Sequence, residues 1–359
     1  MTKKIVFITS GIKTGGAEKQ LALLAGGLRA HSFEPVIISL SRTNEGDALP
    51  DFANLQVIQY DCRPGPGLIA SFYKIRSLLR TLRPDIIQGW MYAGNIATSL
   101  AGMGLTADIY HSIRASNMDR TRYGRQIWLN GKLSRLTKAV IANSRTGVGH
   151  HSKMGFRTQK MRVIANGIDC DSFCPDAKAG LTARAALGIG SDETVCLYVA
   201  RVDPMKGHDR LSMAAGLCPE VKFIFVGDGT DRLDVPDNVI TLGTRQDMSA
   251  LYNAVDWLVS WSHYGEGFPN VIAEAMACGT PVCANDSGDS WFVIGDTGHK
   301  CTAHTPQQIA EEIRMLAQRP ASKAERQRSV KRIKDHFSVK AMISAYAAVY
   351  QADHVKVSL

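Results

Sequence analysis

Two glutamates, Glu266 and Glu274, flank the segment whose residue types best suit the binding of a sugar joined to a diphosphate. The residues between them read Gly-Phe-Pro-Asn-Val-Ile-Ala, and Pro269 favours the first turn of a helix because its missing N–H is not needed there. Gly279 predicts the end of that helix. Glu266 is therefore expected in the loop before the helix and Glu274 about one turn inside it. Both carboxylates could then face one ligand.

The loop around Glu266 has the composition of a phosphate-binding turn. Gly265 and Gly267 allow the backbone to approach a diphosphate closely, and a carboxylate accepts hydrogen bonds from sugar hydroxyls. Spacing alone favours a solvated acid and an acid on a helix surface, because such pairs of glutamates arise by chance. The Gly-Glu-Gly-Phe-Pro-Asn loop, with a helix directly after it, favours the ligand site.

Two cations, Arg201 and Lys206, follow a predicted strand at 194–200. An arginine and a lysine at the carboxyl end of a parallel strand can clamp a diphosphate. The alternative is a pair of surface cations on a loop, and the position at the strand end favours the ligand role.

Two further features lie in the first half of the chain. Gly15 and Gly16 separate the first predicted strand from the first helix, where they permit close approach to phosphate or sugar, although a bare turn fits too. The full G-x-G-x-x-G fingerprint of NAD-binding proteins is missing there. His111 closes the run Asp-Ile-Tyr-His at 108–111, a position that suits a structural histidine as well as a functional one.

The elements that must position these residues alternate between strand and helix along the whole chain. Such alternation indicates parallel sheets covered by helices on both faces, and two successive series indicate two Rossmann-like domains of an α/β protein. Helices are expected between most strands, for example at 17–30 and 95–103. The predicted strands are 4–9, 35–40, 55–61, 85–90, 108–113, 139–144, 194–200, 221–226, 239–242, 257–261 and 281–284.

The predicted domain boundaries lie where the alternation of strands and helices is interrupted and then begins again. We predict a domain at 1–166, a linker at 167–182, a second domain at 183–338 and a C-terminal segment at 339–359, in which apolar residues at helical spacing indicate a helix at 339–351 that packs back on the first domain. Two such domains facing each other would place strand carboxyl ends and helix N-termini on both sides of a cleft. Ligands of α/β sheets, phosphates among them, bind in such places.

The chain has a net charge of +9, and its excess of positive charge lies in the first half. Residues 1–170 hold 23 Lys and Arg against 10 Asp and Glu, which gives +13 and leaves −4 for the rest. The segments 69–82 and 120–138 combine arginines and lysines with apolar residues at helical spacing. Such helices can lie on an anionic membrane, or their apolar faces can simply pack on the sheet. Nucleic-acid binding is not expected, because no recognisable module is present.

Other classes of protein fit the sequence poorly. No apolar run approaches the ~20 residues of a membrane-spanning helix, and the N-terminus is too soon interrupted for a secretory signal, so a cytoplasmic location is expected. The eight cysteines are scattered and are expected to be free thiols. Asp169-Cys170-Asp171 matches the Asp-x-Asp string of metal-dependent transferases but falls in the predicted linker, so no metal and no cofactor are expected.

Taken in order, these features resemble the retaining family-4 glycosyltransferases of the GT-B fold, of the type that builds bacterial surface polysaccharides such as lipopolysaccharide and capsule. The resemblance covers nearly the whole chain, and the set of motifs in order is specific where each alone is not. The matching segments are Gly15–Glu18, Asn143-Ser144, Asn166–Asp169, Arg201 with Lys206, Val226–Gly229, and Glu266 with Glu274 as the E-x7-E motif.

The resemblance implies a role for each candidate residue. Glu266 would contact hydroxyls of the donor sugar, and Glu274 would contact the ribose. Arg201 and Lys206 would hold the diphosphate. The remaining candidates are the backbone of Gly267, Phe268, Pro269 and Asn270 at the sugar and phosphate, Gly15 and Gly16 closing over the donor from the other domain, and His111 near the reacting sugar.

The implied activity is transfer of a hexosyl or N-acetylhexosaminyl group from a UDP-sugar to a lipid-linked oligosaccharide or polysaccharide, with a GDP-sugar as the nearest variant. The implied mechanism is a metal-independent front-face reaction with retention. The basic first domain would make peripheral contact with the inner face of the plasma membrane. A sugar-nucleotide epimerase on the same fold and a non-catalytic nucleotide-sugar-binding protein remain alternatives. The donor sugar, the acceptor and the oligomeric state are left open.

Overall fold

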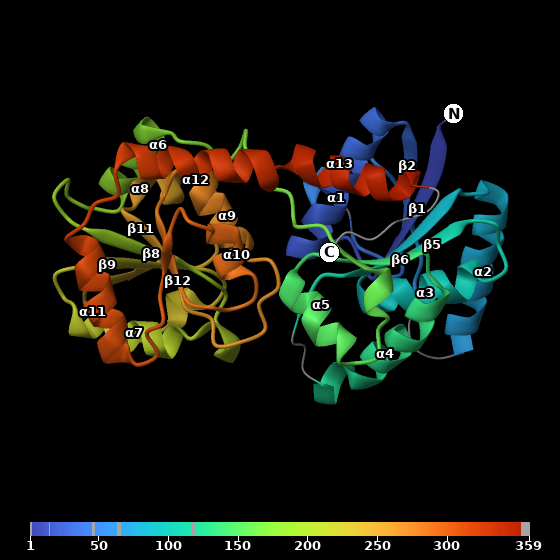
Figure 1. The fold of residues 1–359 in the computed structure, drawn as a ribbon, viewed down its shortest axis with the longest axis horizontal. Coiled ribbons are helices and arrows are strands. Elements are labelled where there is room, and N and C mark those ends of the chain that lie inside the picture. The colour runs from blue at the N-terminus through green and yellow to red at the C-terminus, as the bar shows by residue number, and fades with distance from the viewer. Residues whose placement is uncertain (1, 14, 45–46, 63–65, 117–119, 353–359) are drawn as a thin grey trace. The chain divides into compact units, whose positions relative to one another are not determined.

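The computed structural model describes residues 2–13, 15–44, 47–62, 66–116 and 120–352. The chain forms two compact units. The first unit runs to Gly167 and also takes in the chain from Val339 onward, and the second unit is Ile168–Ser338. Each unit is a parallel sheet with helices packed against it (Figure 1).

The sheet of the first unit has seven strands in the order β3-β2-β1-β4-β5-β6-β7, and every pairing in it is parallel. The central strands are almost continuously apolar because both faces of the sheet are covered. The strands are β1 (Lys3–Thr9), β2 (Phe33–Ser39), β3 (Gln56–Gln59), β4 (Ile86–Trp90), β5 (Asp108–Ile113), β6 (Ala139–Ala142) and β7 (Met161–Val163).

Side-chain alternation along β1 assigns helices to the two faces of this sheet. Ile5 and Phe7 pack with α1 (Gly16–Leu28) and α13 (Val339–Gln351), whereas Val6 and Ile8 pack with α2 (Pro66–Leu82) and α3 (Met91–Gly102). The helices α4 (Arg120–Leu133) and α5 (Arg145–Ser152) complete the unit.

The C-terminal helix α13 returns to the first unit and lies beside α1 (Figure 1). Gly27 of α1 leaves room for Ile343, because a Cβ at this glycine would lie 2.0 Å from the Ile343 Cδ1. Tyr346 and Tyr350 are fully buried on the same helix face. The spacing of apolar residues in the sequence predicts the bounds of this helix correctly.

The sheet of the second unit has six parallel strands in the order β10-β9-β8-β11-β12-β13. They are β8 (Val195–Val199), β9 (Lys222–Val226), β10 (Val239–Thr241), β11 (Trp257–Ser260), β12 (Val282–Ala284) and β13 (His299–Lys300). The helices are α6 (Ala177–Ala186), α7 (His208–Leu217), α8 (Met248–Ala254), α9 (Asn270–Ala277), α10 (Ser290–Ile294), α11 (Pro306–Ala317) and α12 (Lys323–His336).

The predicted linker at 167–182 is wrong over its second part, because α6 begins there at Ala177. The Asp176 side chain caps this helix by accepting a hydrogen bond from the Ala179 N–H at 2.9 Å. Gly180 then packs against the backbone of Asn253 at the end of α8, where a Cβ would lie 2.3 Å from the Asn253 carbonyl oxygen. Tertiary packing of this kind leaves little trace in local composition.

Two short edge strands, β7 and β13, are also missing from the prediction, because three and two residues carry too little alternation to be noticed. Within the described residues, no helix combines the length and the apolarity needed to cross a membrane.

Candidate active site

A cavity of about 190 Å³ lies at the carboxyl edge of the second sheet. The ends of β8 and β11 and the start of α9 enclose it, which is where a parallel sheet exposes strand ends and helix N-termini. Its lining residues are Tyr198, Val199, Ala200, Lys206, Ser260, Ser262, Glu266, Phe268, Pro269, Asn270 and Val271.

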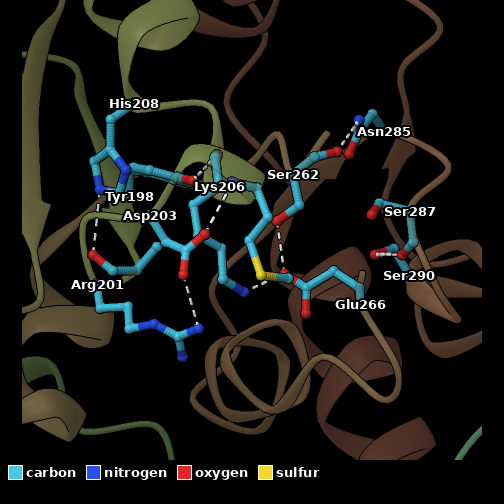
Figure 2. Close-up of polar contacts among 12 residues, drawn as sticks. Tyr198, Arg201, Asp203, Lys206, His208, Ser262, Glu266, Asn285, Ser287 and Ser290 are labelled. Atoms are coloured by element: carbon cyan, nitrogen blue, oxygen red, sulfur yellow. Dashed lines mark hydrogen bonds and ion pairs between the residues drawn. The ribbon is translucent and has the colours of Figure 1, made fainter. Parts of the chain in front are cut away.

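Lys206 and Glu266 form an ion pair on this cavity, and Figure 2 shows the two side chains directed at each other. The Ser262 hydroxyl donates to the same Glu266 Oε1 at 2.6 Å, and the Tyr198 hydroxyl donates to the Lys206 carbonyl. Only 18% of the lysine side chain and 17% of the glutamate side chain are exposed. The cation and the anion are therefore held close together with little water around them. The sequence analysis selected both residues, each from a different segment.

The loop that carries Lys206 is fixed by local hydrogen bonds. The Asp203 carboxylate accepts from the Met205 N–H at 3.0 Å, and the Arg201 guanidinium lies 3.0 Å from the other Asp203 oxygen. The Met205 N–H, and then Arg201, hold the pKa of Asp203 below its usual value. Arg201 follows the lining residue Ala200 directly, and 61% of its side chain is exposed, so its charge faces solvent beside the cavity.

The loop that carries Glu266 is fixed by close backbone packing. Gly288 has φ +62°, and a Cβ there would lie 2.6 Å from both the Glu266 Cβ and the Gly267 carbonyl oxygen. The Asp289 N–H donates to that same Gly267 oxygen at 3.0 Å. The loop after β12 therefore buttresses the loop before α9, and only a glycine fits between them.

Glu274 lies in the fifth position of α9, one turn inside the helix as its spacing predicts. It accepts a hydrogen bond from the Tyr252 hydroxyl at 2.9 Å. Burial, and then the Glu274 charge, hold the pKa of Tyr252 well above its usual value, so the phenol is a proton donor to the carboxylate. Glu274 is outside the cavity lining, in contrast to Glu266.

Gly15 and Gly16 lie in the first unit at the start of α1. Gly15 is the extended residue before the helix, and a Cβ there would lie 2.2 Å from a Glu18 carboxylate oxygen. The Trp90 indole N–H at the end of β4 donates to the Ala17 carbonyl at 2.9 Å. The glycine turn is thus anchored at the carboxyl edge of the first sheet.

His111 lies inside the first sheet and not at the end of its strand. It lies within β5, fully buried, and its Nε2 is 2.8 Å from the Ser99 hydroxyl of α3. Burial lowers its pKa to about 3, so the ring is neutral at ordinary pH. These are the properties of a core histidine, and the two further residues of β5 after it separate it from the strand end.

The residue that does stand at the end of β5 is Arg114, which the sequence prediction passed over. Its guanidinium lies over the Trp90 ring, 4.4 Å from the ring centroid, and donates to the Asn166 side-chain oxygen at 2.7 Å and to the Tyr346 hydroxyl at 3.1 Å. The signal that could have found it is the one that selected Arg201, an arginine directly after a parallel strand.

Asp169 of the Asp-x-Asp string takes part in a local turn. Its carboxylate accepts from the N–H of Asp171 at 3.1 Å and from the hydroxyl of Ser172 at 2.6 Å. In the part of the chain that the structure describes, no group of three or more His, Cys, Asp or Glu residues is arranged to hold a metal ion.

Comparisons with known families match the two halves of the chain separately. Residues 14–172 match the model described as Glycosyltransferase Family 4, and residues 193–319 match the model described as Glycosyl transferases group 1. A curated relative, the D-inositol 3-phosphate glycosyltransferase of Mycobacterium sp. (strain KMS), is 34% identical over 178 residues, which cover 45% of this chain and 40% of the relative. The chain therefore spans less than half the length of that relative.

Solved structures resemble the chain over nearly its whole length. The Anabaena protein Alr3699/HepE in complex with UDP is 23% identical, covers 96% of this chain with 98% of its own, and has a TM-score of 0.84. The structure of the same protein in complex with UDP-glucose has a TM-score of 0.81, at 22% sequence identity and the same coverage of both chains. Together with the two parallel sheets, this likeness confirms the predicted GT-B fold.

Proposed function

We propose, from the match of both halves of the chain to glycosyltransferase domains on a GT-B fold, that this protein transfers a sugar from a nucleotide-diphosphate donor to an acceptor hydroxyl. The observation that carries the proposal is the Lys206–Glu266 pair on the cavity before α9. It supplies a cation for phosphate and a carboxylate for sugar hydroxyls within one site. The UDP and UDP-glucose complexes of the Anabaena protein of the same fold support a UDP-sugar as the donor.

Donor binding would exchange the partners of this pair. Lys206 would turn to the diphosphate together with Arg201, and Glu266 would accept hydrogen bonds from the sugar. The side chains of Lys206 and Glu266 are mostly shielded from water, so the contacts that these two residues make would be strong. Glu274, held by Tyr252, would accept from the ribose. The backbone from Gly267 to Asn270, at the start of α9, would bring its N–H groups toward the phosphates.

The reaction we propose retains the configuration of the transferred sugar. The bond between the anomeric carbon and the β-phosphate oxygen breaks, and the acceptor hydroxyl forms its bond on the same face. The hydroxyl proton passes to the departing phosphate. The developing negative charge would be stabilised by Lys206, Arg201 and the N-terminus of α9.

The acceptor we propose is a lipid-linked oligosaccharide or polysaccharide at an anionic membrane surface. Part of α2 does pack on the sheet, since Ile75 and Leu79 are fully buried, but its outer face does not. Large apolar side chains are exposed there and directly after the neighbouring α3, 66% for Ile69, 72% for Tyr73 and 51% for Met103. Arg76 lies among them, in keeping with a basic, apolar surface that meets lipid.

Calorimetric titration with UDP and GDP tests the donor part of the proposal. We expect UDP to bind more tightly than GDP, and we expect Lys206→Met to weaken UDP binding by about tenfold or more, because a charge-assisted contact is lost. Lys300→Met, which removes an exposed lysine of the same unit, should leave the affinity unchanged. The proposal would be refuted if neither UDP nor GDP binds at millimolar concentration.

The transfer itself is tested by release of UDP from a panel of UDP-sugars in the presence of a membrane lipid extract. Transfer predicts UDP release that depends on the extract. A sugar nucleotide altered without any acceptor would instead identify an epimerase, and binding without turnover would identify a non-catalytic protein.

A further inference from the structure

Arg114 of the first unit is a shielded cation without a carboxylate partner. It follows β5 at the carboxyl edge of the sheet, with Trp90 at the end of β4 beneath it. The side chain is half-buried as a whole, and its Nε is fully enclosed. Within the described residues, no Asp or Glu lies within ion-pair distance of it, although the arginine Arg184 and the lysine Lys138 have such partners.

The hydrogen bonds of Arg114 leave much of its guanidinium unused. A guanidinium offers five N–H donors in a fixed plane. One goes to the Tyr346 hydroxyl at 3.1 Å and one to the Asn166 oxygen at 2.7 Å, and both acceptors are neutral. The Nε has no acceptor among the residues that the structure describes. Each terminal nitrogen carries a second N–H that these two bonds leave unused, so two donors of the planar fork remain besides the enclosed Nε, and the charge is not neutralised.

A shielded, unpaired guanidinium lowers the stability of the folded protein unless a ligand pairs with it. A charge that is taken out of water and not paired destabilises the fold, and burial accordingly lowers the pKa of Arg114. The face of Trp90 and two neutral hydrogen bonds offset only part of this cost. The same contacts hold the guanidinium in one orientation, which prepares it to bind an oxyanion through two parallel hydrogen bonds.

We infer that Arg114 recognises an oxyanion on the acceptor, so that the substrate of this protein carries a phosphate ester or a carboxylate close to the hydroxyl that is glycosylated. The inference rests on the proposed function, in which the first unit binds the acceptor. The proposed donor residues Lys206 and Glu266 belong to the second unit, whereas Arg114 belongs to the first. The charge of +13 carried by residues 1–170 attracts an anionic ligand to the same unit.

A purely structural role for Arg114 predicts the opposite stability change. If the guanidinium serves only to tie α13 to the sheet through Tyr346, its replacement by a neutral residue removes useful contacts and lowers the melting temperature. If Arg114 awaits an anion, the neutral variant loses an unpaired charge. Arg114→Gln, which retains an amide donor, should then melt at the temperature of the wild type or higher in the absence of ligand.

The experiment measures melting temperature and calorimetric affinity of the full chain, with UDP present to occupy the donor site. The probes are glucose 6-phosphate, glucuronate and glucose, which differ in the oxyanion they carry. We expect glucose 6-phosphate, glucuronate or both to raise the melting temperature of the wild type, and glucose to have no effect. Which of the two acts distinguishes a phosphate from a carboxylate on the acceptor.

Arg114→Gln should bind the active probe about tenfold or more weakly, and Arg114→Lys should be intermediate because it keeps the charge and loses the planar fork. Arg157→Gln is the matched control, since it removes an exposed arginine of the same unit. If Arg114→Gln does not fold, the loss of affinity in Arg114→Lys decides.

The inference is overturned if neither anionic probe stabilises the wild type, or if Arg114→Gln keeps the full stabilisation. Failure of the proposed function is visible separately, because UDP then does not bind to wild type or variants, while the shift caused by the anionic probe can still be measured without it.

Discussion

Lys206 and Glu266 are each other's charge partner, although they are 60 residues apart in the chain. The Ser262 hydroxyl adds a second donor to the same carboxylate oxygen. A donor molecule that uses both residues must therefore break a shielded ion pair. Each new contact has to be better than the one it replaces, which favours a ligand that offers phosphate and sugar hydroxyls together.

Glu266→Gln keeps the size of the side chain and removes its charge. We expect turnover to fall by about 10²-fold or more, because sugar recognition is lost in the transition state. UDP binding should be no weaker, since Lys206 is freed from its partner. Steady-state UDP release and calorimetry measure the two effects, with Glu311→Gln as a control at an exposed glutamate of the same unit. Turnover like that of the wild type would remove Glu266 from the mechanism.

Gly288→Ala should damage the site through the backbone. The new Cβ would lie 2.6 Å from the Glu266 Cβ at a φ of +62°, so both strain and a clash are expected. Gly188→Ala is the matched control, because Gly188 has φ +67° and open space around it. We expect the control to lose about 1 kcal/mol of unfolding free energy and Gly288→Ala to lose more.

Denaturant melts measure the two glycine variants, and UDP release shows whether the Glu266 loop has moved. Equal losses of stability in both, with full activity in Gly288→Ala, would show that the loop after β12 does not hold the Glu266 loop in place.

Membrane contact through α2 and α3 is tested by introducing charge into their exposed apolar surface. Replacing Ile69 and Tyr73 together by glutamate should reduce binding to vesicles rich in anionic phospholipid, because buried apolar area and attraction to lipid are both lost. Leu181→Glu is the control, since Leu181 is 68% exposed on α6 of the second unit. Co-sedimentation that does not change in the double variant contradicts the proposed surface.

Two buried histidines predict how stability depends on pH. Burial lowers the pKa of His111 to about 3 and that of His151 to about 4, from an ordinary value of 6.5. At a pH between the lowered pKa of each histidine and its ordinary value of 6.5, the unfolded chain binds a proton that the folded chain does not. The free energy of unfolding should therefore be full above about pH 6.5 and fall as the pH drops toward 4, by up to about 1.4 kcal/mol per pH unit for each histidine.

Denaturant melts between pH 4 and 7 measure this slope. His151→Gln should make it shallower, whereas His304→Gln, at an exposed position, should leave it unchanged. A stability that stays constant down to pH 4 would contradict the neutral, buried state of both histidines.

The sequence by itself determined the fold class and the elements that carry the candidate residues of the second unit. Apolar runs and helical periodicity are local signals, so they predicted the long strands, the helix 339–351 and the strands that precede the Arg201 and Glu266 loops. Pro269 and Gly279 bracketed α9 for the same reason, because caps depend on residues close in the chain. The short edge strands were missed because three and two residues show too little alternation, and the start of α6 was missed because its packing against Asn253 is distant in sequence.

Only the tertiary structure decided which polar residues face each other. The pairing of Lys206 with Glu266 requires β8 and β11 to be adjacent in the sheet, and the burial of His111 depends on α3 covering β5. The Arg114 guanidinium is held by contacts with Trp90, Asn166 and Tyr346, which come from three other parts of the chain. Side-chain charge and shielding are properties of what surrounds a residue, and no local pattern records them.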